Sequence, residues 1–132
     1  MAKLVTLHDT DGEIIYPQTI SNMDYSTSEQ DTGCKWIDGK PIYKKTVSIG
    51  ALPNATSKSV AHGITNLGLV VKAEGFASDS GGVRVIFPFA SVSAVGDQIT
   101  MRFEATNVVI FTGTNRSGFS GYVTLWYTKT TD

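Results

Sequence analysis

Apolar and polar residues alternate with a period of two along most of this chain, and short clusters of Gly, Asn, Asp and Ser separate the alternating runs. This period is typical of β-strands with one buried and one solvated face. No stretch carries a sustained apolar stripe at helical spacing, so we expect no helix longer than about two turns. The pattern predicts strands at residues 42–49, 58–64, 67–77, 83–91, 98–105, 108–112 and 122–129.

Two further segments are expected before these strands. The apolar runs at residues 4–7 and 13–16 flank the turn-forming residues 9–12, which is a hairpin signature. Residues 18–33 are polar and predict an extended connector. We therefore predict an all-β chain. Residues 1–33 would form an N-terminal hairpin and connector, and residues 34–132 an antiparallel β-sandwich with jelly-roll or Greek-key-like connections.

The last predicted strand shows how the alternation assigns side chains to the two faces of a sheet. Val123, Leu125 and Tyr127 share the more uniformly apolar face, which we expect to face the core. Trp126 then points away from the core. A tryptophan on the outer face of a sheet usually covers a ligand or another subunit.

Length, charge and cysteine content narrow the functional classes. A chain of 132 residues suits one domain with its own core. The net charge of −1 gives no basic face, so nucleic acid is not an expected partner. The apolar runs are too short to insert into a membrane, and the N-terminus lacks the apolar segment of a signal peptide. The single cysteine, Cys34, excludes an internal disulfide.

Catalytic chemistry has little support in the sequence. His62 stands at the end of a predicted strand and is interpreted as a structural histidine, and Cys34 as a packed or exposed thiol. No G-x-S-x-G motif is present, and nothing pairs two carboxylates as a glycosidase requires. Residues 8–13 resemble a fragment of a calcium loop, but they are interpreted as a hairpin turn. We expect no catalytic residue, no metal site and no cofactor, and so no enzyme.

Two polar loops are the candidates for ligand binding. Carbohydrate recognition combines an aromatic ring, which stacks on the sugar, with a few placed polar groups. The loop at residues 112–119 offers Asn115, Arg116 and Phe119, and the loop at residues 78–82 offers Asp79. Hairpin ends gather at the poles of a sandwich, where binding residues are often found. The alternative is that both loops are ordinary solvated turns.

Three blocks of the chain resemble the tip domain of tail fibres and receptor-binding proteins from phages and prophages of Gram-positive and gut bacteria. One is the N-terminal module at residues 1–17, with its Asp11-Gly12-Glu13-Ile14-Ile15-Tyr16-Pro17 motif. Another runs from Asn115 to the terminal residues Tyr122-Val123-Thr124-Leu125-Trp126-Tyr127-Thr128-Lys129-Thr130-Thr131-Asp132. The third, followed by residues 50–54 and 60–64, is Trp36-Ile37-Asp38-Gly39-Lys40-Pro41-Ile42-Tyr43-Lys44-Lys45-Thr46.

This resemblance implies a non-enzymatic adhesin at the tail tip of a virion, made in the bacterial cytoplasm. Its partners would be other tail proteins and a host surface polysaccharide or teichoic acid. It would act as a homotrimer, in which weak sites combine by avidity. Trp126 and Tyr25, an apolar residue of the thinly apolar connector, are the expected contacts between subunits.

Three alternatives remain open from the sequence. The protein could be a tail or baseplate component that only assembles and binds no receptor. It could be a lectin-like module unrelated to phages. It could also be a polysaccharide depolymerase or esterase, although no catalytic constellation supports that class.

Overall fold

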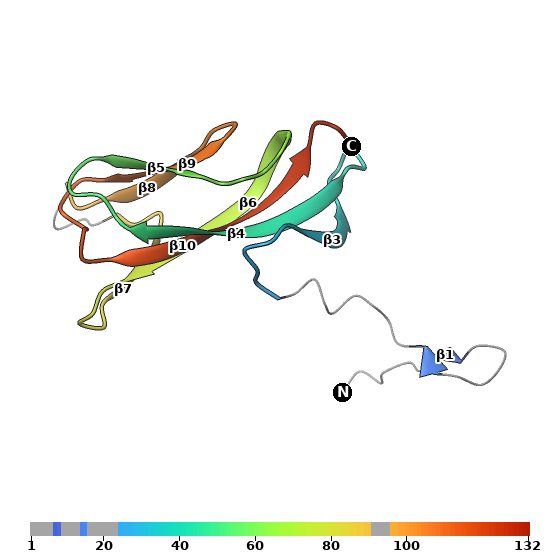
Figure 1. Ribbon diagram of the computed structural model, residues 1–132, viewed down its shortest axis with the longest axis horizontal. Helices are drawn as coiled ribbons and strands as arrows, with labels where there is room; N and C mark the ends of the chain where they lie inside the picture. The colour runs from blue at the N-terminus through green and yellow to red at the C-terminus, as the bar shows by residue number, and fades with distance from the viewer. Residues whose placement is uncertain (1–6, 9–13, 16–23, 91–95) are drawn as a thin grey trace.

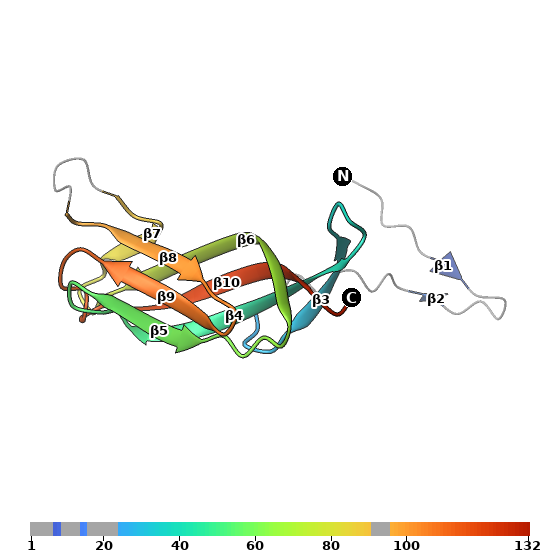
Figure 2. The ribbon, with the colours of Figure 1, turned by 90° about the horizontal axis from the view of Figure 1, so that it is seen from above.

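The computed structural model describes residues 7–8, 14–15, 24–90 and 96–132. Within these residues the chain contains strands and no helix. Two antiparallel sheets of unequal size stack on each other (Figure 1), and the smaller one covers only part of the larger (Figure 2). The predicted all-β sandwich is confirmed.

The larger sheet has five strands and the smaller sheet has three. The chain passes from one sheet to the other after β4, β5, β7 and β9. In spatial order, the larger sheet contains β3 (Gln30–Lys35), β4 (Pro41–Ala51), β10 (Ser120–Lys129), β6 (Leu67–Ser78) and β7 (Arg84–Phe87). The smaller sheet contains β5 (Ser57–Ala61), β9 (Asn107–Thr112) and β8 (Ile99–Phe103).

The C-terminal strand β10 lies at the centre of the larger sheet. It pairs antiparallel with β4 on one side and with β6 on the other. Val123, Leu125 and Tyr127 are fully buried, so the core face predicted from the alternation is confirmed. The rest of the core comes from both sheets and the loops between them: Val47, Ile49, Leu52, Ile64, Ala77, Val85, Phe87, Ile99, Val108 and Ile110.

Strand β3 was not predicted. Its sequence contains no alternating apolar residues, and its side chains are mostly exposed. It forms because its backbone pairs with β4 across the turn at Asp38-Gly39, where Gly39 adopts a φ of +86°. The sandwich therefore takes in residues 30–33, which the pattern had assigned to the connector.

The segment before β3 is also attached to the larger sheet. The N–H of Thr46 donates to the carbonyl of Ser26, at 2.9 Å. The Tyr127 hydroxyl donates to the Glu29 carboxylate. Burial, followed by this hydrogen bond, raises the pKa of Tyr127. Residues 24–29 thus belong to the folded body.

At the N-terminus, β1 (Leu7–His8) pairs antiparallel with β2 (Ile14–Ile15), as the predicted hairpin requires. The turn of that hairpin at residues 9–12, its outer residues 4–6 and 16, and the connector at residues 18–23 lie outside the described residues.

His62 links the β5–β6 connection, residues 62–66, to the β8–β9 turn, residues 104–106, at one end of the smaller sheet. Its side chain is buried, and its Nδ1 accepts a hydrogen bond from the N–H of Ile64 at 3.0 Å. Since Nδ1 is an acceptor, Nε2 carries the proton and donates to the carbonyl of Glu104 at 2.9 Å. The structural interpretation of this histidine accounts for both ring nitrogens.

We expect His62→Ala to lower the free energy of unfolding by about 2–4 kcal/mol, because it opens a cavity and removes the partner of the buried Ile64 N–H and of the Glu104 carbonyl. Urea denaturation measures this loss. Ser59→Ala, an exposed position on β5, should change stability by no more than about 0.5 kcal/mol. Equal free energies of unfolding of the two variants would show that the hydrogen bonds of His62 do not stabilise the fold.

Candidate functional site

A row of three side chains crosses the outer face of the larger sheet, the face turned away from the smaller sheet. Trp126 on β10 is paired in register with Lys44 on β4 and with Lys72 on β6. Residues in direct cross-strand register interact most closely on a sheet face. The indole ring of Trp126 therefore lies between the side chains of two lysines. The sequence predicted that Trp126 faces away from the core, but not that lysines flank it.

The two lysines differ in their surroundings. Lys44 is 4% exposed, and its Nζ lies 3.8 Å from the ring centroid of Tyr25 and 5.5 Å from that of Trp126. The same ammonium donates to the carbonyl of Asp24 at 3.0 Å. Lys72 is exposed, and its Nζ lies 4.3 Å from the ring centroid of Trp126. All three contacts between an ammonium group and a ring are cation–π interactions.

This row forms the floor of an open groove of about 580 Å³. Trp36, at the β3–β4 turn, also lines it, so both tryptophans of the chain meet in one place. The single cysteine, Cys34, lines it as well. The full lining is Tyr25, Thr32, Cys34, Trp36, Ile42, Lys44, Val71, Lys72 and Trp126.

A second, smaller hollow of about 210 Å³ follows on the same face, and Tyr25 lines both hollows. The Tyr25 hydroxyl donates to Glu74 at 2.8 Å, and this hydrogen bond raises the pKa of the phenol. Beyond it lie Phe76 and Tyr122, with ring centroids 5.9 Å apart, and Ile86. These three side chains form an exposed apolar patch on β6, β10 and β7.

The two residues predicted at a subunit interface, Tyr25 and Trp126, therefore meet at the groove. The structure brings them together through Lys44, whose ammonium lies against both rings. Their role between subunits stays a prediction.

The predicted ligand residues of the β9–β10 loop have partners within the fold. Arg116 forms an ion pair with Asp97, and its guanidinium lies 5.2 Å from the ring centroid of Phe119 and 5.5 Å from that of Phe89. The Arg116 side chain is only 12% exposed. Asn115 is exposed, and its Oδ1 accepts from the N–H of Ser117. These contacts stabilise the loop and leave Asn115 as its most accessible predicted ligand residue.

Asp79 holds the β6–β7 turn together. Its Oδ1 accepts a hydrogen bond from the N–H of Val83 at 2.8 Å, and the N–H of Asp79 donates to the carbonyl of Val83 at 3.0 Å. This turn and the β9–β10 loop both lie at the end of the sandwich away from β3 (Figure 1). The groove and the predicted loop site are thus separate places on the molecule.

Groups that could support catalysis or metal binding are scattered. His62 uses both ring nitrogens within the fold, and Cys34 is exposed. Among residues 7–8, 14–15, 24–90 and 96–132, no three His, Cys, Asp or Glu side chains gather to hold a metal ion. The same residues contain no helix long and apolar enough to cross a membrane.

The sequence pattern did not predict that Trp36, Lys44 and Lys72 belong to one site. The register of β4, β10 and β6 brings Lys44 and Lys72 together, and the β3–β4 turn places Trp36 beside them. The one available signal was Trp126 on the outer face, which pointed to a covered surface but not to its neighbours. Finding the lysines required the order of strands in the sheet, which is set by tertiary structure.

No protein-family model, no curated protein and no solved structure matches this chain. Its function is therefore inferred from its own residues.

We expect Arg116→Ala and Asp97→Ala each to lower the free energy of unfolding by about 2 kcal/mol, because each leaves a partly buried charge without its partner. The double variant should be little less stable than either single variant, since the two changes remove the same ion pair. Chemical denaturation of the four proteins measures this coupling. Additive losses would mean that Arg116 and Asp97 act separately.

Proposed function

We propose that the protein is the tip domain of a phage tail fibre, a non-enzymatic adhesin that attaches to a host surface glycan as a homotrimer at the tail of the virion. The observation that carries the binding role is the outer-face groove, in which Trp36, Trp126 and Tyr25 converge. The phage assignment rests on the sequence resemblance of residues 1–17, 36–46 and 115–132.

The composition of the groove supports carbohydrate as its ligand. Aromatic rings present flat apolar faces to the C–H groups of a sugar ring, and lysine and threonine side chains supply hydrogen-bond donors. Lys72 is exposed and provides such donors in the groove, whereas the Thr32 hydroxyl already donates to the carbonyl of Ile42. The groove volume of about 580 Å³ falls within the range of small-molecule sites, and its open form suits a length of polymer.

A shallow groove is sufficient if the protein is a trimer. Three weak sites that engage one surface together can bind about 10²–10⁴ times more tightly than one site. Avidity requires that all three sites can bind at the same time. A repetitive wall polymer allows this, because it offers many copies of the same unit.

The apolar patch favours a second candidate, a tail or baseplate component that only assembles. Phe76, Tyr122 and Ile86 are 49%, 44% and 66% exposed on the same face as the groove. Exposed apolar side chains that cluster in this way often mark a protein interface. In the trimeric adhesin the patch would contact neighbouring subunits or tail proteins and leave the groove open. Trp126 and Tyr25 would then face the ligand instead of the neighbouring subunit that the sequence analysis assigned to them.

We expect Trp36→Ala to reduce attachment to whole bacteria from a panel of Gram-positive and gut species by about tenfold or more, because it removes one aromatic wall of the groove. The matched variant Asn115→Ala, at the β9–β10 loop, should attach as the parent does. Flow cytometry of cells with fluorescently labelled protein measures both.

The opposite pattern, with loss in Asn115→Ala alone, would move the site to the loop. Attachment of the parent to no cell type in the panel would instead favour the purely structural component. Trp36 is partly buried at a turn and is not one of the core residues, so this substitution leaves the core intact.

The homotrimer has its own test. Light scattering should give three times the subunit mass of 14.2 kDa at micromolar concentration. Replacing Ile86 by Asp should lower this mass, because a charge in an apolar contact is costly to desolvate. A single species at the subunit mass would contradict the trimer.

A further inference from the structure

We propose that the outer-face groove selects acidic glycans, whose phosphodiester or carboxylate groups are held by Lys72, beside the buried charge of Lys44, while the sugar ring lies against Trp36. This inference rests on the proposed function, because it names the ligand class of the same groove.

The sign of charge in the groove is the first argument. Of the residues that line the groove, only Lys44 and Lys72 carry charge, and both are cationic. The neighbouring carboxylate, Glu74, lines the adjacent hollow and accepts a hydrogen bond from Tyr25. The charged side chains of the groove lining are therefore both positive, and they attract an acidic ligand.

The aromatic residues would suit a different ligand if the lysines were absent. A cluster of two tryptophans and a tyrosine is the usual composition of a cage for quaternary ammonium groups. Here the ammonium groups of Lys44 and Lys72 already lie against the rings of Tyr25 and Trp126. A cationic ligand such as choline would be repelled, so the lysines reverse the charge preference that the rings alone would give.

The two lysines contribute in different ways. Lys44 is held beneath Tyr25 and fixes a positive charge in the floor of the groove. Lys72 is exposed, so its ammonium is available for direct contact with a ligand. A cation–π contact at an exposed site is weaker than a charge-assisted hydrogen bond to an anion. Lys72 can therefore bond an acidic group at little loss.

The two tryptophans make the groove directly observable. Since Trp36 and Trp126 both line it and are the only tryptophans in the chain, tryptophan fluorescence, excited selectively over tyrosine, comes from this groove. Four probes separate the possible ligands. A phosphodiester-linked polyol oligomer and an oligogalacturonate carry phosphate and carboxylate respectively, a β-1,4-linked N-acetylglucosamine oligomer is neutral, and choline chloride is cationic.

The full chain should give a saturable fluorescence change with at least one acidic oligomer, and the response of the two oligomers distinguishes phosphate from carboxylate. Binding should be at least about tenfold weaker for the neutral oligomer. It should weaken with salt, because screening reduces contacts between charges. Lys72→Gln should weaken the acidic ligand about tenfold, whereas Lys72→Arg should retain most of the binding.

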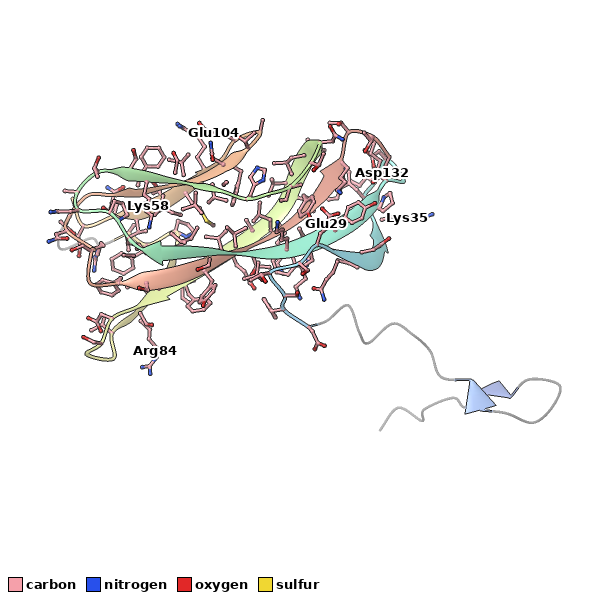
Figure 3. All side chains as sticks on the ribbon, in the orientation of Figure 1. Glu29, Lys35, Lys58, Arg84, Glu104 and Asp132 are labelled. Atoms are coloured by element: carbon pink, nitrogen blue, oxygen red, sulfur yellow. The ribbon has the colours of Figure 1, made fainter. Side chains whose placement is uncertain are left out.

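Arg84→Gln is the control for net charge. It removes one positive charge from an exposed residue of β7, and Arg84 lies at the opposite end of the sandwich from Lys35 of β3 (Figure 3). This variant should bind the acidic oligomer as the parent does. If Arg84→Gln and Lys72→Gln weakened binding of the acidic oligomer equally, the effect would come from overall charge, and the proposal would be overturned.

Two further outcomes would also overturn it. One is a response to the neutral oligomer or to choline that equals or exceeds the response to both acidic oligomers. The other is the absence of any saturable response to either acidic oligomer. In both cases attachment of the parent to cells, with its loss in Trp36→Ala, would still support the adhesin, so the two proposals fail separately.

Discussion

The position of β10 between β4 and β6 is the constraint on which the rest of the structure depends. Strand β10 pairs on both sides, so the larger sheet cannot form until Ser120–Lys129 has paired with both β4 and β6. On one face, Val123, Leu125 and Tyr127 fill the centre of the core. Such non-local pairing also implies slow folding, because distant segments must meet before their contacts stabilise them.

The same strand builds the functional face. Because side chains alternate across a strand, the residues between the core positions point to the outer face, where Trp126 stands between Lys44 and Lys72. Residues 24–29 and β3 then form the sides of the groove. Glu29, which accepts a hydrogen bond from the buried Tyr127, attaches this N-terminal segment to the core. One face of β10 thus contributes Val123, Leu125 and Tyr127 to the core, and the other face contributes Trp126 to the groove.

The sequence predicted the parts of this fold that follow from local chemistry. The core face of β10, the turn at Gly39 and the absence of long helices came from alternation and turn residues alone. β3 could not be predicted in this way, because Gln30–Lys35 has no apolar alternation and is held mainly by backbone pairing with β4. The groove could not be predicted either, since Trp36, Lys44 and Lys72 meet only after the strand order is set. Arg116 shows that residue type alone can suggest a different role. It was predicted to contact a ligand, but it is largely buried against Asp97 and Phe119 and stabilises the loop.

Modification of Cys34 tests most directly whether the outer-face groove is the recognition surface. Cys34 is exposed, lines the groove and is the only cysteine, so a maleimide carrying a large polyethylene glycol chain can be attached there and nowhere else on a thiol. Attachment of the modified protein to cells should be lost, while a Cys34→Ser variant treated with the same reagent should attach as before. Undiminished attachment of the fully modified protein would contradict the groove as the binding site.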